Sequence, residues 1–187
     1  MTLTPRHEPV ELAKCYRLLN HGPVTIVTSA HQGERNIMAA AWAMPLDFDP
    51  PKVAVVIDRN TWSRGLIEAS GRFALNIPTR AIASQVLAVG SHSGRDGDKY
   101  AALGLDTFLG DSDLPLLSGC AAWLECRVLP ETAMQQRYDL FLAEVTAAWA
   151  DPALYSEGRW HFPSQESRTL HYIAGGAFFA TGESFEV

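Results

Sequence analysis

The spacing of apolar residues changes after the first twenty positions. Between residues 9 and 20, apolar side chains recur at helical intervals, and His21, Gly22 and Pro23 follow as a stop. This pattern predicts one amphipathic helix over residues 9–20. From Pro23 onward the chain consists of short runs rich in β-forming residues, separated by turn residues such as those at 31–34 and 49–51.

These runs predict seven or eight strands, at residues 24–30, 36–44, 52–58, 72–77, 121–129, 140–150 and, as a late pair, 170–173 and 178–180. The first three follow one another through short loops, which favours an antiparallel meander over βαβ units. We therefore expect a mainly β fold, a closed or nearly closed antiparallel β-barrel with peripheral helices. No linker divides the chain, so residues 1–187 are expected to form a single domain.

Two helices are expected to interrupt the strands. The first spans residues 62–70, capped by Asn60 or Thr61 and closed by Gly71. The second spans residues 80–89 and is closed by Gly90. A polar, glycine-rich loop over residues 91–98 follows, and residues 103–117 read as irregular structure, the kind of long loop that often carries function.

Composition narrows the range of functions. The chain has 187 residues, of which 47% are hydrophobic and 19% charged, as expected of a globular protein. The formal net charge is −6 and the basic residues lie singly, so we expect no nucleic-acid partner. No apolar run approaches the ~20 residues that span a bilayer, and the amino end lacks the apolar stretch of a signal peptide. These features predict a cytoplasmic protein without a membrane partner.

The common catalytic and metal-binding motifs are missing. The six histidines and three cysteines form no cluster of zinc spacing, so we expect no metal site. The cysteines are expected to be small buried residues. The sequence contains no phosphate-binding Walker motif and no G-x-G-x-x-G after a strand. Residues 90–94 imitate a nucleophile elbow, but His92 stands where the serine would be, which excludes the hydrolase interpretation.

One short segment has the features of an anion site. Residues 59–64 follow a predicted strand and enter a predicted helix, where free backbone N–H groups, hydroxyls and guanidinium groups meet the positive end of the helix dipole. This combination suits a phosphate. The alternative is an ordinary N-cap with solvated arginines.

The run of residues 36–44 is unusual because small residues occupy both of its faces. Such a strand lets a flat group or another chain approach its backbone closely, with Trp42 and Met44 at the edge of that group. The alternatives are tight packing in a central barrel strand and a contact between two copies of the chain.

Several segments, taken in order, resemble a known family. They are residues 23–28, 36–42, 49–51, 71–78, 98–100, 120–127, 138–145 and 170–176. Together the segments are similar to the flavin reductase-like, FMN-binding split-barrel family, and the flavoredoxin-like branch is the nearest within it. The resemblance covers nearly the whole chain and implies a homodimer of split β-barrels that holds FMN noncovalently near the subunit interface, with FAD as the alternative flavin.

The resemblance also implies roles for individual residues. By position, the isoalloxazine ring would be lined by Asn36, Met38, Ala39, Ala40, Ala41 and Trp42. The ribityl chain and the phosphate would be held by Arg59, Asn60, Thr61 and Ser63, and Lys99 would add a charge to the phosphate. Asn76 and Ser91 complete the cofactor-binding candidates.

The implied activity is that of an FMN-dependent oxidoreductase. NAD(P)H would pass hydride to the bound flavin, which would then reduce free flavin, a partner monooxygenase or another acceptor. Many relatives carry a histidine where this chain has Tyr138, the candidate for substrate binding, and glycine where it has Ala143. The alternative is an FMN-binding electron carrier or flavin-storage protein without nicotinamide turnover. A third hypothesis is a split-barrel protein that binds a different ligand in its pocket, such as haem or pyridoxal phosphate.

Overall fold

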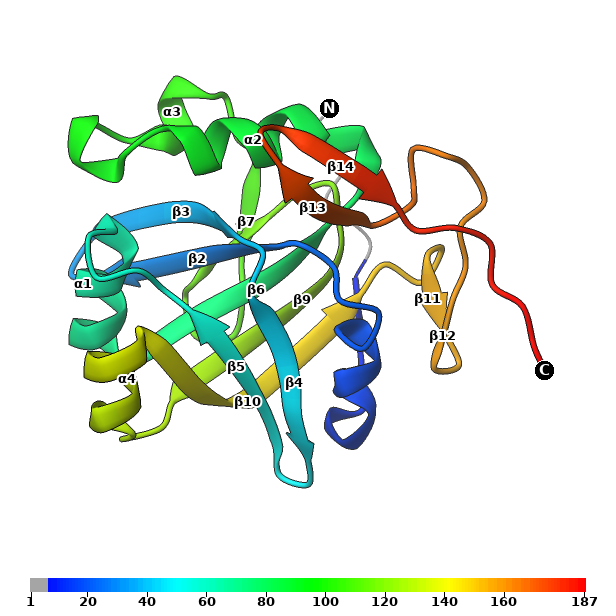
Figure 1. Ribbon diagram of the computed structural model, residues 1–187, viewed down its shortest axis with the longest axis horizontal. Coiled ribbons are helices and arrows are strands. Elements are labelled where there is room, and N and C mark those ends of the chain that lie inside the picture. Colours follow the sequence, from blue (N-terminus) through cyan, green and yellow to red (C-terminus); the bar gives the residue numbers. More distant parts are fainter. Residues whose placement is uncertain (1–6) are drawn as a thin grey trace.

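A large antiparallel sheet dominates the computed structural model, which describes residues 7–187 (Figure 1). Its strands follow the order β3–β2–β6–β9–β10–β5–β4, and β1 pairs with β10. Their bounds are β1 Glu8–Pro9, β2 Thr25–His31, β3 Glu34–Ala40, β4 Ala43–Phe48, β5 Pro51–Val56, β6 Arg72–Pro78, β9 Cys120–Val128 and β10 Leu140–Ala150. The mainly β, split-barrel fold predicted from the sequence is confirmed.

Shorter elements surround this sheet. Three hairpins are formed by β7 Thr107–Leu109 with β8 Pro115–Leu117, β11 Tyr155–Ser156 with β12 Arg159–Trp160, and β13 Leu170–Ala174 with β14 Ala177–Ala180. The α-helices are α1 Trp62–Ser70, α2 Ala83–Ser91, α3 Lys99–Ala102 and α4 Thr132–Tyr138. The 3-10 helices are η1 Leu12–Leu18, η2 Arg80–Ile82 and η3 Gly94–Asp96. In Figure 1, the β13–β14 hairpin lies against α2 above the sheet, whereas α1 and α4 lie together at one end of it.

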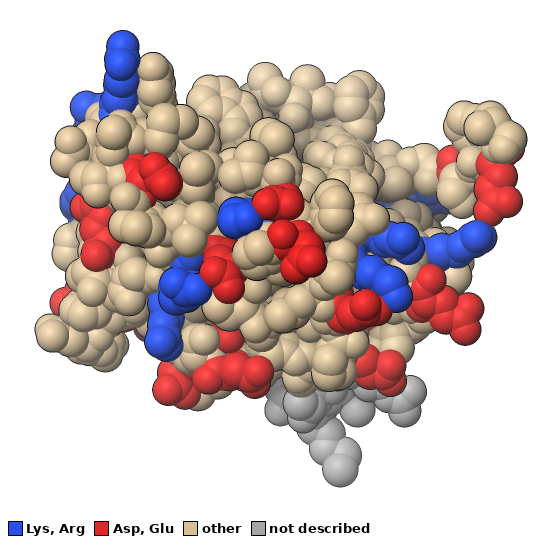
Figure 2. All heavy atoms as spheres, turned by 90° about the horizontal axis from the view of Figure 1, so that it is seen from below, with Lys and Arg blue, Asp and Glu red and all other residues tan. Residues whose placement is uncertain are grey.

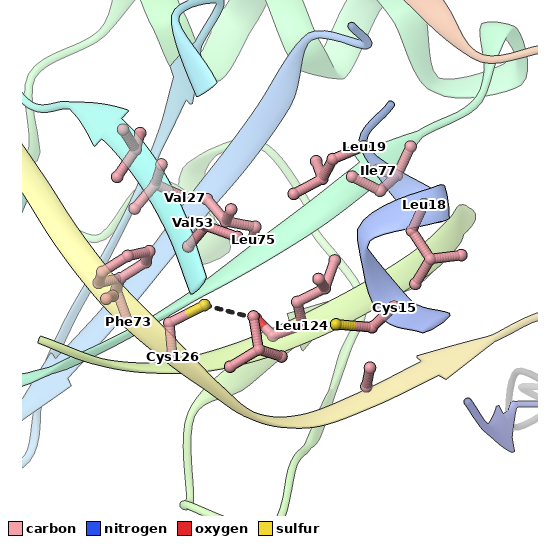
Figure 3. Packing of buried hydrophobic residues seen from close by; sticks show 14 of the residues in the cluster. Cys15, Leu18, Leu19, Val27, Val53, Phe73, Leu75, Ile77, Leu124 and Cys126 are labelled. Carbon is pink, nitrogen blue, oxygen red and sulfur yellow. Dashed lines mark hydrogen bonds between the residues drawn. The ribbon is translucent and has the colours of Figure 1, made fainter. Parts of the chain in front are cut away.

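The central strands are buried on both faces because the sheet separates two cores. Neighbouring residues point to opposite faces of a strand, so Ile26 and Val27 of β2 enter different clusters. The inner core lies inside the rolled sheet, where Val27, Leu75 and Leu124 are cross-strand neighbours on one face of the sheet (Figure 3). The outer core packs Ile26 and its neighbours under α2, α3 and the β7–β8 hairpin.

The three cysteines are free and buried, as expected. Cys15 on η1 and Cys126 on β9 both lie in the inner core (Figure 3), whereas Cys120 lies in the outer core. Burial raises the pKa of the Cys15 thiol to about 11, so this thiol stays protonated and unreactive at neutral pH.

Two predicted elements near the amino end take a different form. The expected helix over residues 9–20 is a shorter 3-10 helix, η1, in which Lys14 N donates to Glu11 O (2.8 Å). The expected strand over residues 36–44 is two strands, β3 and β4, with a break at residues 41–42. The break follows from topology, because β3 pairs with β2 and β4 pairs with β5, at opposite ends of the sheet order.

Further corrections concern helices and short strands. The helix expected over residues 80–89 begins as η2 and continues as α2, and Gly90 lies inside it instead of closing it. The segment 103–117 holds the β7–β8 hairpin, and α4 occupies a stretch for which no helix was predicted. By contrast, α1 and β10 have the predicted bounds, and Gly71 closes α1 with a positive φ of 69°.

Charge is dispersed on the face that Figure 2 shows, where basic and acidic side chains lie interspersed. None of the helices described within residues 7–187 is long and apolar enough to cross a membrane.

Candidate functional site

A cavity of about 300 Å³ lies beside β3, between the start of α1 and the end of α2. We call it the polar cavity. It brings together residues from distant parts of the chain that the sequence analysis singled out, namely Asn36, Met38, Ala39, Asn60, Thr61, Ser91 and Lys99. Its remaining lining residues are Trp62, Val89, Gly90, His92, Ser93 and Gly94.

The β3 wall of the polar cavity is held by Asn36, a buried residue. Its Nδ2 donates to Ser63 Oγ (3.0 Å), and its backbone oxygen accepts from Tyr100 Oη (3.0 Å). On the opposite wall, Gly94 approaches so closely that an added Cβ would overlap Asn36 Oδ1. A side chain at this position would therefore displace either the loop or the amide.

The start of α1 forms a second wall, shaped by Asp58. Its Oδ1 accepts from Asn60 N (2.7 Å), and its backbone oxygen accepts from Thr61 Oγ1 (2.8 Å). Thr61 occupies the N-cap position with extended backbone angles, but its hydroxyl does not cap the helix. The first-turn N–H groups of α1 therefore receive no capping bond from the Thr61 side chain and suit an anion.

Lys99 forms the base of the polar cavity. Its Nζ donates to Ile37 O (2.7 Å) on β3 and to Val89 O (2.8 Å) on α2, which ties the two walls together. An ammonium group has three donors, so one remains after these two bonds. Burial lowers the pKa of Lys99 to about 8.

A smaller, mostly apolar cavity of about 200 Å³ adjoins the first and shares Ala39, Gly90 and Ser91 with it. We call it the apolar cavity. It continues along Ala41 to the β13–β14 hairpin, where the rings of Tyr172 and Phe178 lie 5.3 Å apart, edge to face. Together the two cavities form a polar end and an apolar end of one depression along β3, within the size range of ligand sites.

A larger cavity of about 580 Å³ at the β2–β3 turn is a poorer candidate. Its walls carry charges of both signs, with Glu34 and Asp113 beside Arg35 and Arg72. These four side chains are exposed, and Arg35 already pairs with Asp98 (3.1 Å). The polar cavity has a buried cation instead, which makes it the better anion site.

The family model for the flavin reductase like domain matches residues 17–176. The chain belongs to this family. It is 46% identical over 182 residues to an uncharacterized protein, YddH, of Escherichia coli, covering 95% of this chain and 96% of that one. It is 27% identical over 140 residues to the reductase subunit HsaB of a flavin-dependent monooxygenase of Mycobacterium tuberculosis, covering 72% of each chain.

A solved structure of an FMN-binding domain of flavin reductase-like enzymes, from Shewanella baltica, is also similar. It superposes with a TM-score of 0.95 at 48% sequence identity, and the match covers 99% of both chains. The flavin reductase-like fold is therefore shared over the whole chain. Some of the residues that the family resemblance implied as cofactor-binding lie outside the two cavities beside β3.

Three residues that were predicted to bind the cofactor, Arg59, Ser63 and Ala40, line neither cavity. Arg59 turns toward α4, where it pairs with Asp139 (3.2 Å) and donates to Gln136 O (3.2 Å). Ser63 lies behind Asn36, as the acceptor of its amide. Ala40 is buried in the inner core.

Asn76 is a buried residue, and its side-chain amide is engaged in hydrogen bonds. Its Nδ2 donates to Ile26 O (2.9 Å) and Thr28 Oγ1 (3.3 Å), and its Oδ1 accepts from Leu117 N (2.8 Å). The amide joins β2, β6 and β8 within the sheet. The structure thus shows a role of the Asn76 amide within the sheet, and its cofactor role stays a prediction.

Two exposed aromatic residues lie outside both cavities. Trp42 follows Ala41 at the break between β3 and β4 and is 75% exposed. Tyr138, at the end of α4, is 54% exposed, and the guanidinium carbon of the neighbouring Arg137 lies 5.3 Å from its ring centroid.

Trp62 of α1 and three residues of the loop after α2, His92, Ser93 and Gly94, line the polar cavity although the sequence did not indicate them as site residues. The polar composition of residues 91–98 identified this loop, but composition does not tell which of its residues face β3. Within residues 7–187, His, Cys, Asp and Glu side chains form no group of three or more that could hold a metal ion.

Proposed function

We propose that the protein is an FMN-dependent oxidoreductase that takes hydride from NAD(P)H. The polar cavity would receive the phosphate and ribityl chain of FMN, and the isoalloxazine ring would follow β3 toward the apolar cavity. The observation that carries this proposal is the buried Lys99 ammonium at the base of a cavity that also gathers helix N–H groups, hydroxyls and an amide.

The residues of the two cavities fit such a ligand in charge and shape. Lys99 and the start of α1 would bind the phosphate, and Asn60 and Thr61 would offer polar groups to the chain that follows it. Ala39 and Ala41, which have small side chains, would let a flat ring approach β3. Bound FMN would supply hydride acceptance and electron transfer, and the protein would supply binding and orientation.

A surface beside the cavities supports the proposed homodimer. The strand β4 exposes every second residue, and Met44, Leu46 and Phe48 are large apolar residues on that face. Trp42 precedes them, next to Ala41 of the apolar cavity. We call Trp42, Met44, Leu46 and Phe48 the β4 stripe. A contiguous apolar surface of this kind is typical of a protein interface.

The electron acceptor is proposed to be free flavin, a partner monooxygenase or another protein. The similarity to a monooxygenase reductase subunit of Mycobacterium tuberculosis supports the second of these. We also propose a cytoplasmic location, which the three free thiols favour.

A specific observation favours a second candidate, an FMN-binding electron carrier without nicotinamide turnover. The family resemblance implied a substrate contact at Tyr138, but Tyr138 lies on the surface, outside both cavities. A nicotinamide ring would have to find its contacts elsewhere.

One experiment separates these candidates. FMN and FAD are titrated into the purified apoprotein, and flavin fluorescence reports binding. The flavin-loaded protein is then mixed anaerobically with NADH and with NADPH while its visible absorbance is followed. Bleaching within seconds supports the oxidoreductase. Bleaching by dithionite alone supports the carrier, and a lack of binding by either flavin contradicts both.

A further inference from the structure

Lys99 is an unusual cation because the protein buries it without an opposite charge. Lys99 is only 6% exposed. Both of its hydrogen-bond partners are backbone carbonyl oxygens, Ile37 O and Val89 O. Among residues 7–187, no carboxylate lies within ion-pair distance of its Nζ. An isolated buried charge is costly, and a basic group reduces this cost by losing its proton.

The charged groups on the surrounding elements are already engaged. On the turn before α3, Asp98 pairs with Arg35 of β3 (3.1 Å) and accepts from Tyr100 N (2.9 Å). The guanidinium of Arg35 lies over the Tyr100 ring, 4.3 Å from its centroid. At the start of α1, Asp58 accepts from Asn60 N (2.7 Å).

The loop after α2 carries three further titratable groups, of which His92 lines the cavity and Arg95 and Asp96 do not. Arg95 on η3 donates to Asn60 O (2.6 Å), and its neighbour Asp96 is exposed. His92 lines the cavity, with its Nδ1 at 2.8 Å from Ala88 O. Burial is the cause of the lowered pKa of Lys99, about 8, among the residues that the structure describes.

We infer that a phosphate monoester entering the polar cavity is bound together with a proton, which the Lys99 amine takes from solvent. The inference rests on the proposed function, since FMN is the ligand that would bring the phosphate. The amine becomes an ammonium, no bond to the ligand forms, and no electron moves. The phosphate dianion supplies the counter-charge that the residues of the cavity do not provide, and the third N–H of Lys99 supplies the donor.

This coupling gives FMN binding a definite pH dependence. With a pKa near 8, the free protein carries the Lys99 proton in about half of the molecules at pH 8, and binding would take up ~0.5 proton there. The FMN dissociation constant would rise by about tenfold between pH 7 and pH 9. The phosphate itself has a second pKa of about 6, so it remains a dianion throughout this range.

Calorimetry on the apoprotein tests the coupling directly. FMN is titrated at pH 8 in two buffers of different ionisation enthalpy, and the difference in heat gives the number of protons taken up. Riboflavin, which has the same ring and no phosphate, is the matched ligand and is expected to show no uptake. The variant His92→Gln removes the other titratable side chain of the cavity and is expected to keep the uptake.

The variant Lys99→Met assigns the proton to this residue. It keeps the length of the side chain but cannot titrate, so its FMN dissociation constant should stay constant between pH 7 and pH 9. Circular dichroism and thermal unfolding establish that the variant is folded. Should it fail to fold, the comparison of FMN with riboflavin on the unmodified protein still decides the question.

Each outcome has one meaning. Proton uptake with FMN alone, lost in Lys99→Met, supports the inference. FMN binding without proton uptake, or uptake of the same size with riboflavin, overturns the inference and leaves the proposed function standing. A lack of FMN binding at every pH overturns the proposed function and the inference with it.

Discussion

The two end strands of the large sheet, β3 and β4, differ in how they meet their surroundings although only residues 41 and 42 separate them. Beside β3 the protein covers the sheet with α2 and α3 and leaves a depression that is polar at one end. On β4, every second residue is exposed to solvent, and the β4 stripe consists of large apolar side chains.

The difference shows two ways of treating the end of a sheet. An uncovered strand at the edge of a sheet tends to associate with other chains. Proteins therefore cover such a strand, place charged residues on it or pair it with a partner. At β3, Lys99 donates to Ile37 O, and α2 and α3 cover the strand within the same chain. At β4, the exposed apolar side chains at every second position are available to contact another chain. We therefore expect β3 to bind a small ligand and β4 to bind a second copy of the protein.

The largest expected effect concerns the β4 stripe. A double substitution, Leu46→Asp with Phe48→Asp, would place two charges in the proposed interface and weaken the dimer by at least ~3 kcal/mol, roughly a hundredfold. Analytical ultracentrifugation over micromolar concentrations measures the change. Leu109→Asp is the control, since Leu109 is also an exposed apolar residue (66%) but lies on β7. A protein that is monomeric before any substitution would contradict the assignment of β4.

The second effect concerns the ligand side of the comparison. Lys99→Met is expected to weaken FMN binding by ~1–3 kcal/mol more than riboflavin binding at pH 7, because a charge-assisted hydrogen bond to phosphate is lost. The substitution also leaves Ile37 O and Val89 O without their donor, so the protein should unfold at a lower temperature. Riboflavin separates the two effects, because loss of folding would weaken both ligands alike.

A third effect tests whether the close packing of the loop on β3 shapes the polar cavity. Gly94→Ala would push its new Cβ against Asn36 Oδ1 and displace either the loop or the amide. We expect FMN binding to weaken by ~1 kcal/mol, about fivefold, as measured by fluorescence titration. Gly65→Ala in α1 is the control, because a Cβ there meets nothing within 4 Å. It should leave binding unchanged and stabilise the helix by up to ~1 kcal/mol. Equal effects of the two substitutions would disprove the role of Gly94.

Much of the sheet could be predicted because its strands have clear boundaries in the sequence. The bounds of β10 and α1 agree with the prediction, and Gly71 marked the end of α1. The division between β3 and β4 could not be predicted, because small residues continue through Ala41 without a turn signal. What separates these strands is the pairing of each with a distant partner, which local sequence does not specify.

The candidate site was predictable residue by residue only in part. The polar cavity gathers Asn36, Asn60, Thr61 and Lys99, as the family resemblance implied. Their contacts with FMN stay predictions, as does the single domain over residues 1–187. The role of Asn76 in joining three strands could not be predicted, because such an amide looks the same in a sequence as one that binds a ligand.

The smallest effect concerns Thr61, where local sequence and structure lead to different expectations. The sequence suggested an N-cap, whose loss would destabilise α1 by ~1 kcal/mol. In the structure, the hydroxyl donates to Asp58 O (2.8 Å) and does not cap the helix. Thr61→Ala should therefore lower the free energy of unfolding by only ~0.5 kcal/mol, the low end for a net hydrogen bond, as measured by urea denaturation.

Thr61→Ala should also weaken FMN binding more than riboflavin binding. The difference should be smaller than for Lys99→Met, because a neutral hydroxyl bonds phosphate less strongly than an ammonium does. Thr61→Ser keeps the hydroxyl and should restore most of that affinity. Equal losses for FMN and riboflavin would mean that Thr61 only shapes the turn before α1, and Lys99 would then be left as the residue that distinguishes the ligand edge at β3 from the apolar edge at β4.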